Sequence, residues 1–232
     1  YYMSMNSSDG AGIALLSVYD KTGIVEFAQG LSDLNWKIYA SGGTAKAISD
    51  AGIAVEDVTS LVGGSAILGH RVVTLSREIS AGLLADKSSP EDLDEMSKLG
   101  LPIIDLVCVD MYPLEEAIAE PDSSLESVIL KTDIGGPTML RSAAKGGRIV
   151  LSKASQRSSV IEWLQTDKPD GQEFVRNLCA IAEYEVARYI VSSAKYLNGN
   201  EVSGYLAQKL SPTKYGENPR QADAGIYADN RV

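Results

Sequence analysis

Residues 36–48 read WKIYASGGTAKAI, and this stretch decides the fold. Residues 36–40 are largely aromatic or β-branched and favour a strand, whereas residues 45–48 favour a helix. Gly42 and Gly43 lie between the two segments and mark a tight turn. The stretch therefore predicts a strand, a turn and the N-terminus of a helix, in that order.

A turn of this kind can bind an anion. The first backbone N–H groups of a helix have no partner within it, and the helix dipole is positive at the same end. Gly42 and Gly43 let an oxygen approach, and the hydroxyls of Ser41 and Thr44 can donate as well. A phosphate group fits such a turn. The alternative is a strand-to-helix turn whose glycines serve backbone geometry alone, because such turns are frequent in α/β folds.

The segments around this stretch continue the alternation of strand and helix. Short apolar runs predict strands that are buried on both faces, and apolar residues at helical spacing predict helices between them. The expected strands are residues 12–18, 36–40, 53–58, 103–111 and 148–152. The sequence thus predicts an α/β fold, a three-layer sandwich with a mainly parallel sheet.

The domain organisation follows from the same pattern. We expect a disordered leader over residues 1–10, an α/β domain over residues 11–153, a helical extension over residues 154–210 and an extended arm over residues 211–232. The extension contains a helix predicted over residues 171–197, whose apolar stripe would cover one side of the sheet or form a subunit contact.

Composition excludes several classes of function. The 232 residues carry a formal net charge of −10, which opposes binding to nucleic acid or to an anionic membrane surface. No segment approaches the roughly 18 apolar residues of a membrane span. Cys108 and Cys179 lie far apart in the sequence and predict neither a disulfide framework nor a metal site. We expect a soluble, cytoplasmic protein without a metal, which can still hold a small phosphate ligand through local donors.

Charged residues near the predicted strand ends are further candidates. Lys21 follows the first strand and so lies at the same sheet edge as Ser41, where ligands gather in open α/β sheets. Arg71 carries a guanidinium that matches the geometry of a phosphate. For both residues the alternative is a solvated loop side chain. His70 is the only histidine, so we expect a surface or supporting histidine rather than a catalytic one.

A second glycine turn precedes another helix. Gly135, Gly136 and Pro137 form an anion-facing or amide-facing turn, and Arg141 and Lys145 share one face of the helix that follows. With Asp133 leading into the turn, this set predicts an acid–base arrangement. The alternative is a solvated basic face.

Six motifs, taken in order, resemble the inosine monophosphate cyclohydrolase domain of PurH proteins, which are bifunctional proteins of purine synthesis. The match spans residues 12 to about 228, and the motifs are specific only together. They are SVYDKTG at 17–23, ASGGTAK at 40–46, RVVTL at 71–75, MYP at 111–113, DIGGPT continuing to AAK at 133–145, and KYGENP at 214–219.

The resemblance implies a methylglyoxal-synthase-like fold with a helical extension, usually as a homodimer. It implies an enzyme that closes the purine ring of 5-formamidoimidazole-4-carboxamide ribonucleotide with loss of water, and no cofactor. Such chemistry needs an anchor for the 5′-phosphate, a donor to the developing oxyanion and a group that shuttles protons. We expect a truncated or stand-alone cyclohydrolase without the formyltransferase domain of the family, and a separate formyltransferase as partner.

Motif positions also imply the site residues. Lys145 would transfer the proton, and Asp133, Tyr112 and Thr74 would complete the catalytic set. The Ser41 turn would surround the phosphate, and the residues near Asp133 would face the base. The substrate-binding residues implied by the resemblance are Tyr19, Asp20, Lys21, Ser41, Gly42, Gly43, Thr44, Arg71, Val72, Val73, Val109, Asp110, Ile134 and Gly135.

The chain departs from the family pattern at a few positions. A lysine usual two residues after Arg71 is Val73, the histidine and proline that follow are Ser76 and Arg77, and an asparagine usual before the Tyr-Pro pair is Asp110. One cation of the site is therefore missing and one acid is added.

Two other functions stay open. The first is a homologue that binds purine nucleotide as a sensor or partner subunit without turnover. The second is a methylglyoxal-synthase-like lyase acting on a triose phosphate, which is disfavoured because its fold relatives use a histidine with paired aspartates, and this chain has a single histidine.

Overall fold

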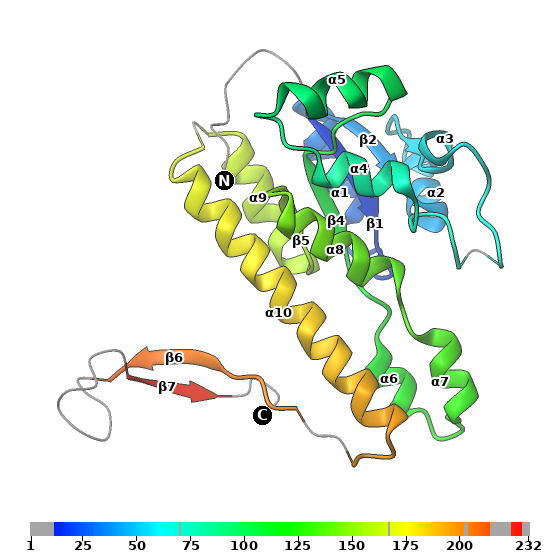
Figure 1. Ribbon diagram of the computed structural model, residues 1–232, viewed down its shortest axis with the longest axis vertical. Helices are drawn as coiled ribbons and strands as arrows, with labels where there is room; N and C mark the ends of the chain where they lie inside the picture. The colour runs from blue at the N-terminus through cyan, green and yellow to red at the C-terminus, as the bar shows by residue number, and fades with distance from the viewer. Residues whose placement is uncertain (1–11, 70, 167, 202–203, 214–223, 229–232) are drawn as a thin grey trace. The chain divides into compact units, whose positions relative to one another are not determined.

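A computed structural model of the chain describes residues 12–69, 71–166, 168–201, 204–213 and 224–228 (Figure 1). The chain divides into two compact units, Tyr1–Ala187 and Arg188–Val232, and the division falls inside helix α10 (Gly171–Leu197). The first unit thus extends past the domain end expected at residue 153. The leader, His70 and the KYGENP motif lie outside the described residues.

The first unit is built on one parallel sheet of five strands in the order β3-β2-β1-β4-β5. The three central strands are buried on both faces, as their apolar runs predict. The strands are β1 (Ile13–Ser17), β2 (Lys37–Ala40), β3 (Glu56–Asp57), β4 (Leu106–Val109) and β5 (Ile149–Leu151). The predicted parallel α/β sheet is confirmed.

Strand β3 is shorter than the predicted strand over residues 53–58. The amide of Ile53 donates to the carbonyl of Ile48, which closes the preceding helix instead of joining the sheet. Glu56 and Asp57 pair with β2, and the amide of Val58 donates to the carbonyl of Ala40 at the end of β2.

Helices cover both faces of the sheet. The chain passes from β1 to β2 in one direction across the sheet and from β4 to β5 in the other, so right-handed crossovers place their helices on opposite faces. Helices α1 (Ile24–Asp33) and α2 (Gly42–Asp50) pack on one face. Helices α4 (Arg77–Leu84) and α8 (Gly135–Lys145) pack on the other, in front of the sheet in Figure 1. The predicted three layers are confirmed.

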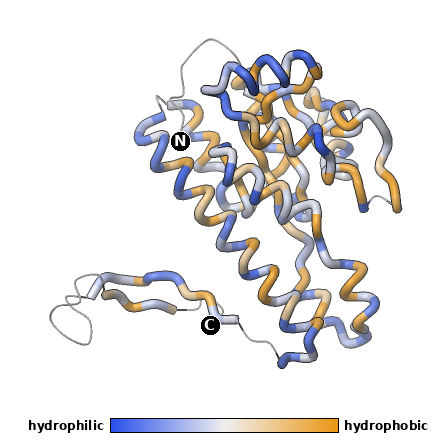
Figure 2. The backbone as a smooth tube through the Cα atoms, in the orientation of Figure 1, coloured by the Kyte–Doolittle hydropathy of each residue, from blue (hydrophilic) through white to orange (hydrophobic). Residues whose placement is uncertain are grey.

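The remaining elements complete the first unit. The helix predicted over residues 171–197 is α10, and its buried residues Val175, Leu178, Cys179 and Ala182 join the hydrophobic core. In Figure 2 hydrophobic residues mark the strands, and hydrophilic ones mark much of α5. The other helices are α3 (Thr59–Val62), α5 (Pro90–Leu99), α6 (Leu114–Ala119), α7 (Leu125–Lys131), η1 (Ala154–Gln156) and α9 (Arg157–Leu164).

The second unit contains the end of α10 and an antiparallel pair of strands, β6 (Gln208–Pro212) and β7 (Gly225–Ala228). The register shifts between Lys209 and Ser211. Part of the arm expected over residues 211–232 is therefore paired β-structure.

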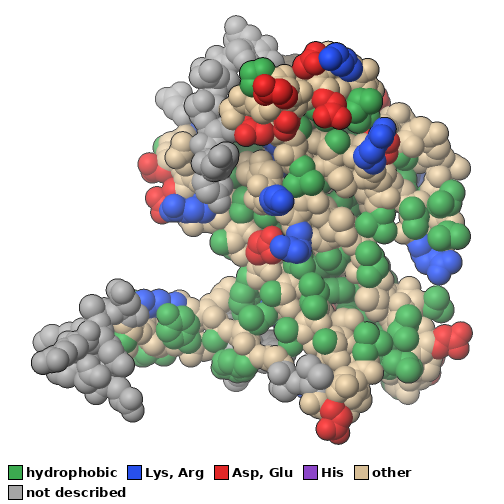
Figure 3. Space-filling view, in the orientation of Figure 1, with side chains coloured by type: hydrophobic (Ala, Val, Ile, Leu, Met, Phe, Trp, Pro, Cys, Tyr) green, Lys and Arg blue, Asp and Glu red, His purple; other side chains and the backbone are tan. Residues whose placement is uncertain are grey.

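Acidic side chains gather over α5, at the top of Figure 3, and its first turn holds Glu91 and Asp92. Both cysteines are buried and free. Within the described ranges, no helix is long and apolar enough to cross a membrane, and no three His, Cys, Asp or Glu side chains cluster as metal ligands would.

Close packing of α8 against α4 fixes the position of α8. Gly146 follows α8, and a Cβ atom placed there would lie 1.9 Å from the carbonyl oxygen of Leu83 in α4. Nearby, the buried Arg148 donates from Nε to the same carbonyl at 2.9 Å and from its guanidinium to the carbonyl of Ala85. The C-terminal end of α8 thus tolerates no side chain at residue 146.

We expect Gly146→Ala to lower the free energy of unfolding by about 3 kcal/mol, because the new methyl group collides with backbone rather than with a side chain that can move. Gly64→Ala is the matched control, since nothing lies within 4 Å of a Cβ atom at that position. Urea denaturation of both variants measures the difference. Equal stability of the two variants would contradict the packing described.

Candidate functional site

The carboxyl ends of neighbouring parallel strands bring polar residues together. Ser17 ends β1 and Ser41 follows β2, and their hydroxyl oxygens lie 2.6 Å apart. Asp110 follows β4, on the other side of β1, and its carboxylate accepts a hydrogen bond from the amide of Tyr19. The sheet therefore places three of the predicted site segments at one edge.

The N-terminus of α2 is open. We call residues 41–43 the α2 turn. Ser41 is the N-cap residue in an extended conformation, but its hydroxyl pairs with Ser17 and does not cap the helix. The exposed amides of Gly42 and Gly43 have no hydrogen-bond partner in the described part of the chain, and Gly42 has a positive φ of 38° that favours glycine. Two donors and a helix dipole thus face outward from this turn.

Thr44 has a different role from the one expected. Its side chain is buried, its hydroxyl accepts from the amide of Val18 at 3.1 Å and it donates to the carbonyl of Val18 at 3.2 Å. Its amide donates to the carbonyl of Ser41. These groups are used inside the fold, so Thr44 joins the start of α2 to the end of β1 instead of donating to a ligand.

Lys21 brings a cation to the α2 turn. A Cβ atom added at Gly43 would lie 3.8 Å from Cε of Lys21, so the lysine side chain lies beside this turn. Its ammonium group donates to the carbonyls of Val18 and Tyr19, the latter at 3.2 Å. Partial burial lowers the pKa of Lys21, while the nearby carboxylates of Asp110 and Asp20 oppose that shift. The turn thus gains a positive charge next to two open amides.

Asp20 serves its own loop. Its carboxylate accepts from the amide of Thr22 at 2.9 Å, and this bond is the chief reason that the pKa of Asp20 is lowered. The side chain is exposed. Asp20 therefore stabilises the loop after β1. The described hydrogen bonds of its carboxylate lie within that loop and not with the α2 turn.

A second cluster forms at the start of α8. The carboxylate of Asp133 accepts from the amide of Gly136 at 3.0 Å, and a Cβ atom at Gly135 would lie 3.0 Å from the hydroxyl oxygen of the buried Thr74. Asp133 thus already uses one amide of the helix N-terminus, which disfavours the anion-facing alternative and leaves the amide-facing one. Ile134, beside it, is 60% exposed. Thr74, Asp133 and Gly135 thus lie close together.

Two aromatic rings meet after the ends of β1 and β4. The rings of Tyr19 and Tyr112 lie 4.8 Å apart between centroids at an interplanar angle of 65°. The neighbouring Tyr112 hydroxyl raises the pKa of Tyr19.

Lys131 is a nearby cation that sequence reasoning missed. It pairs with Glu120 at 2.6 Å. Glu120 raises the pKa of Lys131, and Tyr112 makes a smaller contribution in the same direction. Lys131 lies two residues before Asp133 in the sequence, next to the motif at 133–145, and this position could have marked it as a candidate.

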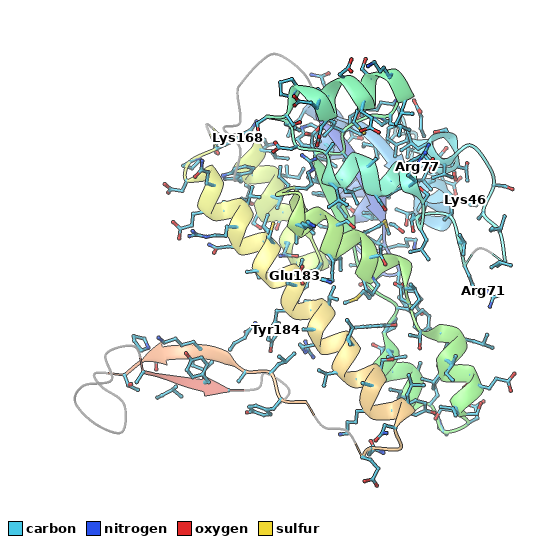
Figure 4. All side chains as sticks on the ribbon, in the orientation of Figure 1. Lys46, Arg71, Arg77, Lys168, Glu183 and Tyr184 are labelled. Carbon is cyan, nitrogen blue, oxygen red and sulfur yellow. The ribbon has the colours of Figure 1, made fainter. Side chains whose placement is uncertain are left out.

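Arg71 is held within its own loop. It is exposed, and Nε donates to the carbonyl of Leu68 at 2.7 Å, near the tip of the loop that leads to α4 (Figure 4). The described contacts therefore do not bring it to the α2 turn. Val72 forms an isolated bridge with Ile67, Val73 packs against the core, and Val109 is buried in β4.

Lys145 lies away from Asp133. It is the last residue of the eleven-residue helix α8, about 15 Å along the helix axis from Gly135. Its side chain is exposed rather than partly buried, and Arg141 pairs with Glu183 of α10 at 3.1 Å. Within one chain, the acid–base arrangement predicted from Asp133, Arg141 and Lys145 is therefore not formed.

Arg157 is a buried contact of the site loop that sequence reasoning also missed. Its guanidinium pairs with Asp110 at 3.5 Å. Burial raises the pKa of Asp110, against the effects of the Tyr19 amide and of Arg157. An arginine at the first position of a helix opposes the helix dipole, and that misplacement was a signal in the sequence.

Fold and site together define an α/β domain whose polar residues and open helix N-terminus lie at the carboxyl edge of a parallel sheet. The chain belongs to the MGS-like domain family, whose model matches residues 23–138.

Curated relatives extend the match to most of the chain. The bifunctional purine biosynthesis protein PurH of Chlorobium phaeobacteroides is 38% identical over 222 residues, which cover 92% of this chain and 42% of that protein. PurH of Macrococcus caseolyticus is 39% identical over 218 residues, or 93% of this chain and 42% of that protein. The chain thus spans less than half the length of these relatives.

A solved structure described as "Crystal structure of ForH" is also similar. It is 35% identical in sequence with a TM-score of 0.69, and the match covers 83% of this chain and 100% of that one. The likeness therefore includes the whole of the ForH chain.

We expect Thr44→Val to cost about 1–3 kcal/mol in the free energy of unfolding, because the buried amide and carbonyl of Val18 lose their side-chain partner. Thr44→Ser keeps the hydroxyl and is the matched control. Urea denaturation measures both. A Val variant as stable as the Ser variant would show that these hydrogen bonds do not join β1 to α2.

Proposed function

We propose that this chain is an inosine monophosphate cyclohydrolase of purine synthesis. The observation that carries the proposal is the open α2 turn with Lys21 beside it, in a chain that matches PurH proteins over about 92% of its length. The ligand is a purine ribonucleotide whose 5′-phosphate accepts from the amides of Gly42 and Gly43 and pairs with Lys21.

The base is proposed to face the second cluster. Thr74, Asp133 and Tyr112 supply hydroxyl and carboxylate groups near the end of β4, where a carboxamide and a formyl group need polar partners. In the reaction the carboxamide nitrogen attacks the formyl carbon and loses one proton, which reaches the former formyl oxygen. The formamido nitrogen then loses a second proton and forms a double bond to the same carbon, and the oxygen departs with both protons as water. The reaction needs a proton shuttle and a donor to the developing oxyanion.

Lys145 is the proposed proton shuttle because of its motif position. Since it lies at the far end of α8 from Asp133, we propose that a homodimer supplies Lys145 from the second copy. A cytoplasmic setting and a formyltransferase partner belong to the same proposal.

A nucleotide-binding homologue without turnover is the second candidate. The observation in its favour is Val73, which packs against the core at the position where the family carries a lysine. The lyase has less support because its fold relatives use a histidine with paired aspartates, and His70 is the single histidine of the chain.

Gly43→Asp tests the phosphate anchor. An acid in the first turn of a helix favours the fold but repels a phosphate, so we expect affinity for inosine monophosphate to fall at least about tenfold, the effect of losing roughly 1.4 kcal/mol. Gly43→Asn has the same shape without the charge and should lose much less. Titration calorimetry measures both, and thermal melting checks the fold. If both variants bind inosine monophosphate with equal affinity, its phosphate does not bind at this turn.

A mixing experiment tests Lys145. Lys145→Ala should still bind inosine monophosphate but lose ring closure, followed by absorbance with the formamido substrate. Gly43→Asp should lose ring closure through weak binding. If the second copy supplies Lys145, equal amounts of the two variants form mixed dimers that restore about a quarter of the sites.

Arg141→Ala is the control for this experiment, because it lies on the same helix face and should retain activity. Full activity of Lys145→Ala would assign the proton shuttle to another group. If each variant is inactive by itself and mixing gives no gain, Lys145 acts within its own subunit. A wild type that binds nucleotide but closes no ring would support the second candidate.

A further inference from the structure

The loop after β1 is held by a buried arginine from a distant element. Arg157 begins α9 and is 4% exposed. Its guanidinium donates to the carbonyl of Thr22 and, at 3.4 Å, to the carbonyl of Asp20. The loop over residues 18–22 carries Tyr19 and Lys21, so Arg157 contacts the backbone on both sides of Lys21.

Asp110 joins the same loop from the other side. Its carboxylate accepts from the amide of Tyr19 through one oxygen and pairs with Arg157 at 3.5 Å through the other. Asp110, Arg157 and the loop therefore form a closed set of contacts among β4, α9 and the segment after β1.

Stability alone does not account for Arg157. The arginine faces the positive end of the α9 dipole, and its Nε has no hydrogen-bond partner among the described residues. A buried donor without a partner costs stability, and a buried ion pair is often no better than apolar packing. The contacts of Arg157 with the loop instead favour a role at the site.

We propose that Arg157 is a positioning residue, which holds residues 18–22 so that Lys21 lies beside the α2 turn and which neutralises the charge of Asp110 near the bound phosphate. This inference rests on the proposed function, because the phosphate is that of the purine ribonucleotide.

The charges around Asp110 set the expected pH dependence. Asp20 and Lys21 face it from the loop and Arg157 from α9; Cys108 of β4 also faces it, but burial raises the pKa of that thiol to about 11. The pKa of Asp110 is already raised by burial, and removal of Arg157 would raise it further. Without Arg157, Asp110 would be ionised at a pH above the pKa of its carboxyl and would repel a phosphate. At a pH below that pKa, the neutral Asp110 would not repel it.

Arg157→Met tests the proposal on the full chain. Calorimetry with inosine monophosphate runs from about pH 4, near the ordinary carboxyl pKa, up to about pH 8. We expect affinity at neutral pH to fall about tenfold or more and to recover as the pH falls through the pKa of Asp110. In Arg157→Met with Asp110→Asn, the pH dependence should return to that of the wild type, which the second ionisation of the nucleotide phosphate at about pH 6 sets, and much of the affinity should return.

Hydrogen exchange and a matched control separate positioning from stability. Arg148→Met removes another buried arginine, 3% exposed, that also donates to two backbone carbonyls but lies against α4. We expect faster exchange of the Tyr19 amide in Arg157→Met and unchanged nucleotide affinity in Arg148→Met. If Arg157→Met does not fold, Arg157→Lys replaces it, because the lysine keeps the positive charge. We expect Arg157→Lys to bind the nucleotide without the pH dependence expected of Arg157→Met, and its loop amides to exchange hydrogen faster than those of the wild type.

Three results would overturn the proposal: unchanged affinity in Arg157→Met, an equal loss in Arg148→Met, or a loss that neither pH nor Asp110→Asn relieves. If the wild type binds no purine nucleotide, the proposed function fails. Hydrogen exchange of the Tyr19 amide then tests separately whether Arg157 positions residues 18–22. Such a role requires faster exchange in Arg157→Met and unchanged exchange in Arg148→Met.

Discussion

The hydrogen bonds between the Thr44 hydroxyl and the backbone of Val18 hold the candidate site together. They join the start of α2 to the end of β1, two segments that come from neighbouring parallel strands. Because this link is buried, the α2 turn and the loop that carries Lys21 keep a fixed relation. The cation and the open amides then face the same space without any further ordering, which lowers the cost of binding an anion.

The two glycine turns of the chain show how local chemistry decides the use of a helix N-terminus. At α8 the carboxylate of Asp133 accepts from the amide of Gly136, so one donor of this helix end is already used within the fold. At α2 the residue in the N-cap position, Ser41, turns its hydroxyl to Ser17 and leaves two amides open. A single side-chain direction thus separates a structural helix end from one that can receive a ligand.

Sequence patterns predicted what depends on local and periodic signals. The buried strand runs and the 27-residue helix α10 were predicted because apolar spacing reports burial directly. Contacts between residues far apart in the sequence were not predicted. Thr44 appeared to be a ligand donor, Lys145 was placed near Asp133, and Arg157 was missed, since each depends on which distant backbone group a side chain meets. The motifs indicated the candidate segments, but not which groups within them are already hydrogen-bonded in the fold.

The two free cysteines give the first unit a chemical reporter of its own. Cys108 lies in the central strand β4 and Cys179 in α10, and burial raises the pKa of each thiol to about 11. Since the thiolate is the reactive form, both sulfurs are protected from alkylation while the fold is closed. Their rates of modification at neutral pH therefore measure how often the sheet and the long helix open, and equal rates would mean that the two open as one cooperative body.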